Sequence, residues 1–113
     1  MPETAIRVKE IIKAYLLVLE KKGIPTQEAY LFGSQAKGTA GSYSDIDLII
    51  VSPAFTDMPR WKRWEILGDA LAEIMEPIEV MAYAPDEIKL AQNKKAGFLH
   101  HILSEPETIE LKI

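Results

Sequence analysis

Two aspartates separated by one residue open the most apolar segment of this chain. Asp45 and Asp47 begin the run Asp-Ile-Asp-Leu-Ile-Ile-Val over residues 45–51, which we expect to be a strand covered on both faces. Alternate residues of a strand point to the same face, so the two carboxylates project together while Ile46 points into the core. Two carboxylates on one face repel each other unless a cation lies between them. Mg²⁺ takes oxygen ligands and is usually completed by phosphates and water, so the pair predicts a Mg²⁺ site.

A glycine–serine pair, Gly33-Ser34, directly follows an expected strand over residues 28–32, and ten residues separate it from Asp45. Gly33 allows the backbone to approach a phosphate closely, and the Ser34 hydroxyl and nearby amides can donate hydrogen bonds to it. Lys37 lies in the same loop and either adds a positive charge to the phosphate or is an ordinary solvated lysine. The loop therefore predicts a phosphate-binding end beside the metal-binding pair.

Each of these features also has a plain structural interpretation. Asp45 and Asp47 could be acids at a solvated strand start, and Ser34 could only cap a short helix. A Gly-Ser pair alone carries no information, and an Asp-x-Asp alone is a weak signal. Their joint spacing, after one strand and into the next, favours the functional interpretation.

The elements around this loop predict one α/β domain over residues 1–113, with a small mixed β-sheet packed by helices. Hydrophobic periodicity and the positions of glycine and proline set their bounds. The expected helices cover residues 3–22, 59–75, a segment opening at Pro85, and 98–103, and the expected strands cover 28–32, 45–51, 78–83 and 108–113.

The helix over 59–75 is expected to be amphipathic. Basic side chains near its start are interpreted as a solvated face, although they could instead meet a triphosphate or an acidic partner; they are Arg60, Lys62 and Arg63. The side chains expected to face the core are Trp64, Leu67, Leu71, Ile74 and Met75.

Composition excludes several classes of protein. Apolar residues make up 48% and charged residues 27%, as in an ordinary globular protein. The formal net charge of −4 argues against direct nucleic-acid binding, which depends on clustered Lys and Arg. There is no cysteine, which excludes disulfides and thiolate metal sites. No apolar run reaches the roughly 20 residues of a membrane span, and we expect a cytoplasmic protein.

The segments Leu31–Gly38 and Ser44–Leu48 together closely resemble the signature of the nucleotidyltransferase superfamily related to DNA polymerase beta. Within that superfamily, the small chain resembles the minimal nucleotidyltransferases, or MNT proteins. The resemblance covers about 15 residues of motif, and the order of elements agrees over most of the chain. It implies a nucleotidyltransferase-like fold.

The resemblance also implies a reaction and a role for individual residues. Family members transfer a nucleoside monophosphate from a nucleoside triphosphate to a hydroxyl and release pyrophosphate. Asp45 and Asp47 match the metal-binding pair, Gly33 and Ser34 match the triphosphate-holding pair, and two Mg²⁺ ions are implied. Glu79 matches the third carboxylate, which ligates metal and helps to remove the acceptor's proton. Many relatives carry Asp at that position, so the longer Glu leaves the geometry in question.

The implied nucleotide is ATP, donating AMP, although another nucleoside triphosphate is compatible with the motif. MNT proteins typically work as antitoxins with a helical HEPN partner and can adenylylate a tyrosine of that toxin. We expect 113 residues to be too few for a separate acceptor-binding domain, so the acceptor is expected to come from another chain. A non-catalytic antitoxin or nucleotide-binding module that covers its partner is the main alternative. An isolated subunit of an aminoglycoside-modifying enzyme is a third. Glu76 is a rival to Glu79 but precedes Pro77 and is expected at a helix end.

Overall fold

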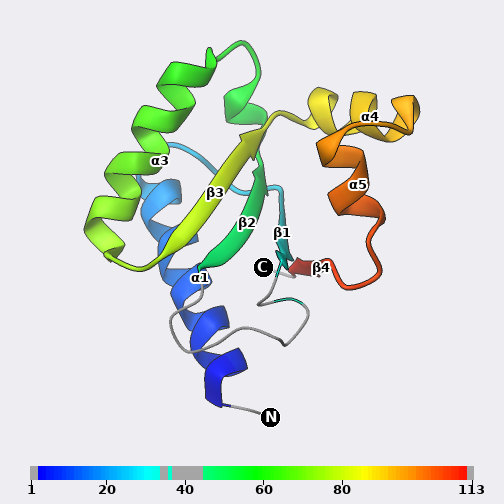
Figure 1. The fold of residues 1–113 in the computed structure, drawn as a ribbon. Helices are drawn as coiled ribbons and strands as arrows, with labels where there is room; N and C mark the ends of the chain where they lie inside the picture. Colours follow the sequence, from blue (N-terminus) through cyan, green and yellow to red (C-terminus); the bar gives the residue numbers. More distant parts are fainter. Residues whose placement is uncertain (1–2, 34–35, 37–44, 112–113) are drawn as a thin grey trace.

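A four-stranded mixed sheet with helices on both faces confirms the expected α/β architecture (Figure 1). The computed structural model describes residues 3–33, 36 and 45–111. Every expected helix and strand is present, with bounds within about two residues of those expected. The described elements are α1 (Glu3–Lys21), β1 (Glu28–Phe32), β2 (Ile46–Val51), the 3-10 turn η1 (Pro53–Phe55), α3 (Arg60–Ile74), β3 (Ile78–Tyr83), α4 (Pro85–Lys94), α5 (Phe98–Ser104) and β4 (Ile109–Leu111).

The strand order in the sheet is β3-β2-β1-β4. β1 runs antiparallel to β2 and β4, whereas β2 and β3 are parallel. The parallel pair is connected through η1 and α3, a crossover that allows both strands to run in the same direction. As a result, β2 and β3 start at the same end of the sheet, and residues near their starts are neighbours.

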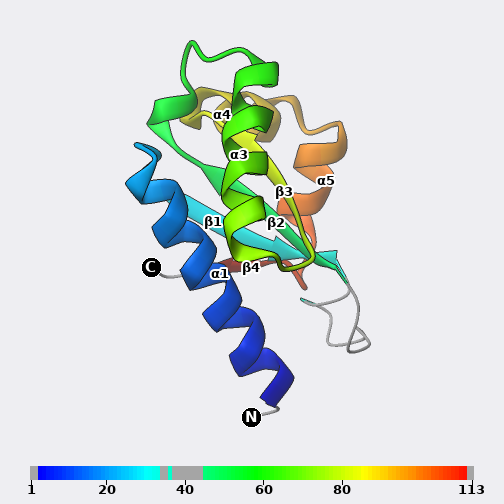
Figure 2. The same cartoon turned by 90° about the vertical axis from the view of Figure 1, so that its left-hand side faces the viewer.

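Two hydrophobic clusters cover the two faces of the sheet. Helices α1 and α3 lie on one face, and α4 and α5 lie on the other (Figure 2). Ile46, Leu48 and Ile50 of β2 join the cluster beneath α1 and α3, whereas Ile49 and Val51 join the cluster beneath α4 and α5. β2 is therefore covered on both faces, as its apolar sequence predicted. By strand alternation, Asp47 shares the face of Ile49 and Val51.

The prediction of which α3 side chains face the core was wrong in part. Leu67 is buried and both Leu71 and Ile74 pack against the core, but Trp64 is 66% exposed and Met75 is 85% exposed. Met75 lies just past the helix with a left-handed backbone, so it has left the helical stripe.

Arg63 was expected on a solvated face and is instead 8% exposed. Its guanidinium donates to the backbone oxygens of Met58, Ala82 and Phe55, and to the Glu87 carboxylate. These bonds satisfy the buried charge, so an arginine occupies the inward position that the sequence assigned to a neighbouring tryptophan. Arg60 and Lys62 are exposed, as expected.

Across residues 3–33, 36 and 45–111, none of the helices combines the length and apolar character that a membrane crossing requires.

Candidate active site

Asp47 and Glu79 lie side by side on adjacent parallel strands. They are Cα partners in the β2–β3 register, close to the start of both strands. Phe32, the last residue of β1, is the partner of Asp47 on the other side. Phe32, Asp47 and Glu79 therefore form a row across the sheet, with neighbours about 4.8 Å apart in the hydrogen-bonding direction. The row brings together two of the three carboxylates that the sequence proposed as metal ligands.

Asp45 lies immediately before β2 and is exposed. It is close enough for its charge to contribute to the raised pKa of Asp47. No group of three acidic or histidine side chains within the described residues is already assembled into a metal-holding cluster. Asp47 and Glu79 thus form the assembled part of the proposed site, with Asp45 at its edge.

The Asp47 carboxyl has a raised pKa. Partial burial is the largest cause, followed by a hydrogen bond to the Glu79 side chain and by the charges of Glu79 and Asp45. Acids this close share a proton or need a cation between them. A divalent metal would satisfy the same electrostatic demand, and carboxylate oxygens are the ligands that Mg²⁺ prefers. The donor chemistry of this pair therefore fits the implied metal.

Gly33 lies directly against the Asp47 carboxylate. A β-carbon added at Gly33 would overlap Oδ2 of Asp47 and would come within 3.1 Å of its Cγ. The Gly33 backbone also has φ = +73°, a conformation that glycine adopts more readily than other residues. The sequence proposed Gly33 as a phosphate-binding residue, and in the structure it adjoins the Asp47 carboxylate. A phosphate beside Gly33 would therefore lie next to the proposed metal ligands.

Ser34 and Lys37, the other proposed nucleotide-binding residues, lie outside the described part of the chain. The rival acid, Glu76, precedes Ile78 in the turn between α3 and β3. It is absent from the cross-strand row, because the partner of Asp47 in β3 is Glu79. Glu79 is exposed and so is accessible to an incoming molecule.

The helices on this face leave the acid pair uncovered. Phe98, at the start of α5, contacts Phe32 edge-on, with ring centroids 6.2 Å apart. Asp47 is only partly buried and Glu79 is exposed, so the cover of α4 and α5 does not extend over them. The acid pair faces solvent on the side where substrates can reach it.

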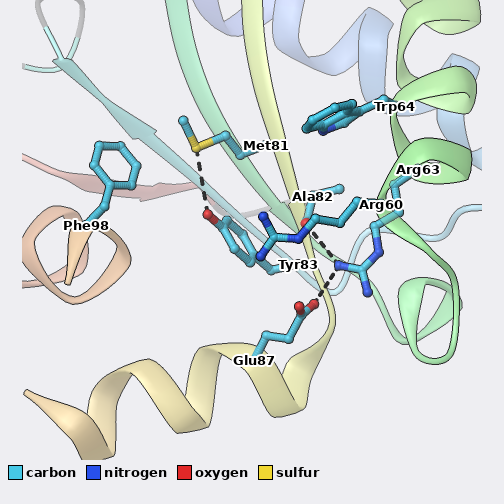
Figure 3. A pocket seen from close by; sticks show the side chains of 8 residues that line it. All are labelled: Arg60, Arg63, Trp64, Met81, Ala82, Tyr83, Glu87 and Phe98. Carbon is cyan, nitrogen blue, oxygen red and sulfur yellow. Dashed lines mark hydrogen bonds and ion pairs between the residues drawn. The ribbon is translucent and has the colours of Figure 1, made fainter. Parts of the chain in front are cut away.

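A cavity of about 280 Å³ lies further along β3 (Figure 3). It is bounded by side chains from α3, β3, α4 and the start of α5. They are Arg60, Arg63, Trp64, Met81, Ala82, Tyr83, Glu87 and Phe98. Met81 and Tyr83 share the face of Glu79, because alternate strand residues point the same way. Part of the cavity lining is therefore on the same face of β3 as Glu79, whereas Ala82 packs toward the opposite face beneath α1 and α3.

Arg63 and Glu87, two of the residues around the cavity, form an ion pair that the sequence did not predict. Nη1 of Arg63 lies 2.6 Å from Oε1 of Glu87, and the same oxygen accepts from the Ala84 amide at 2.7 Å. The ion pair links the start of α4 to α3 beside the cavity. The sequence offered only one indication, an acid in the first turn after Pro85.

Comparisons with known proteins agree with this arrangement. Residues 8–105 match the model of the nucleotidyltransferase domain family. A crystal structure from Sulfolobus solfataricus, named as a candidate nucleotidyltransferase, is similar with a TM-score of 0.65 and 16% identity. That match covers 96% of this chain and 82% of the other, and it shows a shared fold.

A second solved structure is a toxin–antitoxin complex with AMP-PNP. It is similar with a TM-score of 0.45 and 27% identity, over 69% of this chain and 62% of that chain. No curated protein sequence matches this chain significantly.

Proposed function

Because the chain belongs to the nucleotidyltransferase domain family, we propose that it transfers AMP from ATP to a hydroxyl group of a partner protein. The observation that carries this proposal is the row in which Asp47 and Glu79 lie beside each other, with Gly33 against the Asp47 carboxylate. The family match covers the segment that contains all three residues.

We assign a role to each proposed site residue from its position in the sheet or in the loop. Asp45 and Asp47 would hold Mg²⁺, with Glu79 as a third ligand from the adjacent strand. Bound Mg²⁺ would neutralise the triphosphate and stabilise the charge that develops during displacement. Gly33 would allow the triphosphate to approach the acid pair, with Ser34 and Lys37 as proposed donors to its oxygens.

The chemical step is an in-line displacement at the α-phosphorus. The acceptor oxygen forms a bond to the α-phosphorus while the bond from that phosphorus to the α,β-bridging oxygen breaks, and pyrophosphate leaves. The acceptor hydroxyl would give its proton to a base, and we assign that role to Glu79, whose side chain is exposed.

The proposed acceptor is a tyrosine of a helical HEPN toxin, which this protein would neutralise as an antitoxin. The support is the resemblance of Leu31–Gly38 and Ser44–Leu48 to MNT proteins. A second candidate function is neutralisation by binding alone, without transfer. The presence of both aspartates and of Ser34 favours catalysis over that alternative.

The decisive experiment follows a label from ATP to protein. The chain is incubated with Mg²⁺ and the product of its neighbouring gene, using ATP labelled either at the α- or at the γ-phosphorus. Nucleotidyl transfer moves only the α-label to the partner and releases the γ-label in pyrophosphate. Peptide mapping then identifies whether the modified residue is a tyrosine.

Matched variants separate transfer from binding. Asp45→Asn should abolish labelling, whereas Asp69→Asn on the exposed side of α3 should preserve it. Tight complex formation with no α-label on the partner, unchanged in Asp47→Asn, would instead establish the non-catalytic function. Transfer of the γ-label would contradict nucleotidyl transfer altogether.

A further inference from the structure

The cavity lies along β3, the strand that carries Glu79 and that forms one edge of the sheet. In an in-line displacement, the attacking oxygen and the leaving pyrophosphate are on opposite sides of the phosphorus. Under the proposed function, pyrophosphate leaves beside Gly33, at the end of β1. The row from Phe32 through Asp47 to Glu79 then sets the direction of attack, which points outward past β3. β3 is an edge strand of the sheet, so no further strand of the described residues lies beyond it.

The cavity lies a short distance from Glu79 along the same edge strand. Strand residues rise about 3.3 Å each, so Met81 is about 6.6 Å and Tyr83 about 13 Å from Glu79 along β3. A molecule that presents a hydroxyl to Glu79 could therefore place a second group in the cavity. A nucleobase is less well matched to this location, because the triphosphate end of the site lies toward β1 rather than β3.

The side chains around the cavity resemble the centre of a protein interface. Trp64 is 66% exposed and Phe98 is 52% exposed, although both are large and apolar. They surround Met81 and Tyr83 of β3, with Arg60 beside them (Figure 3). Tryptophan, tyrosine, phenylalanine, methionine and arginine are the residue types enriched at protein interfaces.

The charged side chains around the cavity indicate which group of a partner would complement it. Arg63 is neutralised by Glu87 at 2.6 Å, so this pair has no charge to offer a ligand. Arg60 forms no ion pair with any carboxylate in the described part of the chain. One cation without a counter-ion thus remains among apolar rings, and a carboxylate of a partner would complement it.

We propose that this cavity docks the protein that carries the acceptor hydroxyl, by accepting an aromatic side chain next to an acidic residue of that protein. The proposal rests on the proposed function, because the direction of attack comes from it. The docked residues would lie about 7–13 Å from the acceptor hydroxyl, which is two to four residues of extended chain or one to two helical turns.

Synthetic peptides provide a test that does not depend on catalysis. Each fluorescent peptide carries one tyrosine and a Glu-Phe pair placed either three or seven residues after it, and a control peptide has Lys-Ser in place of Glu-Phe. Binding is measured by fluorescence anisotropy to the Asp47→Asn protein. At least one Glu-Phe peptide should bind about tenfold more tightly than its Lys-Ser control, the scale of a single interface hot spot.

Matched variants in the same background assign that preference to the cavity. Arg60→Glu and Trp64→Ala should remove it. Lys62→Glu and Trp61→Ala should keep it, because Lys62 and Trp61 are exposed on α3 but do not line the cavity. Trp61 is 64% exposed, close to the value for Trp64, so the two tryptophan variants remove similar amounts of exposed surface.

The outcomes separate this proposal from the proposed function. If the protein prefers the Glu-Phe peptides but the wild type transfers no α-label from ATP to its partner, docking is supported and the enzymatic function is excluded. Equal binding of all peptides, or a preference unaffected by Arg60→Glu and Trp64→Ala, would overturn docking and leave transfer intact. Loss of ATP affinity in these two variants, with peptide preference retained, would assign the cavity to the nucleobase instead.

Discussion

The backbone of Gly33 and the carboxylate of Asp47 adjoin so closely that no β-carbon fits between them. Gly33 follows β1 and Asp47 lies near the start of β2, so the contact joins the two motifs that the sequence places eleven or more residues apart. The absence of a side chain at Gly33 thereby allows the Asp47 carboxylate to lie directly beside the start of the proposed phosphate loop.

Substitution of Gly33 by alanine should therefore damage the site more than the fold. The added methyl must displace the Asp47 carboxylate, and a displacement of about 1 Å in a reacting group can cost about 100-fold in rate. Gly23→Ala is the matched control, because Gly23 also has a positive φ, of +90°, but its β-carbon would meet nothing within 4 Å. Both variants should lose roughly 1–2 kcal/mol of stability, measured by urea unfolding. Equal transfer activity in the two variants would contradict the role given to this contact.

The raised pKa of Asp47 predicts a pH-dependent stability. A carboxyl whose pKa is higher in the folded state favours folding when protonated, so its contribution is lost as pH rises through that raised pKa. In the absence of metal, the melting temperature of the wild type should fall in a window that begins near pH 4, where unfolded aspartates ionise. Asp47→Asn should weaken this fall and should melt higher than the wild type at neutral pH.

Glu79→Gln should act in the same direction, because it removes a charge that contributes to the raised pKa of Asp47. Differential scanning fluorimetry across the pH range, in EDTA, measures all three proteins. A wild-type profile that stays parallel to that of Asp47→Asn across the window would show that the acid pair is not electrostatically strained.

Arg63 should contribute to stability far more than its basic neighbour. Arg63→Ala removes four hydrogen bonds and leaves Glu87 without its partner, a change that typically costs about 3–5 kcal/mol for a buried pair. Because Glu87 is partly exposed, we expect the lower end of that range. Lys62→Ala, on the exposed side of the same helix, should change stability by less than about 0.5 kcal/mol. Chemical denaturation would contradict this account if both variants unfolded at the same midpoint.

Local sequence patterns were sufficient for the fold, whereas Glu79 was named from the resemblance to the nucleotidyltransferases. The apolar run after Asp47 and the alternation over residues 78–83 predicted two strands, and β2 and β3 were found at those positions. The sequence also named Glu79 ahead of Glu76, and the strand register confirms that Glu79 is the neighbour of Asp47. Register depends on which strands pair and in which direction, and single-strand patterns do not contain that information.

The α3 surface could not be predicted in the same way. A hydrophobic stripe ranks Trp64 above Arg63 for burial. However, backbone oxygens of Phe55 in η1, of Met58 in the following loop and of Ala82 in β3 converge on the arginine. Tertiary hydrogen bonds therefore reversed the order that side-chain polarity suggested. The exposed tryptophan, and with it the cavity along β3, followed from that reversal.

The central claim is that Asp45 and Asp47 bind a nucleotide through Mg²⁺, and calorimetry with α,β-methylene-ATP tests it most directly. This analogue lacks the bridging oxygen that leaves, so binding is measured without transfer. Mg²⁺ should strengthen its binding to the wild type by at least about tenfold relative to EDTA, a free-energy difference of about 1.4 kcal/mol. The Asp45→Asn, Asp47→Asn double variant should show no such gain. Equal binding of the analogue to the wild type in Mg²⁺ and in EDTA, or a full Mg²⁺ effect in the double variant, would contradict the account.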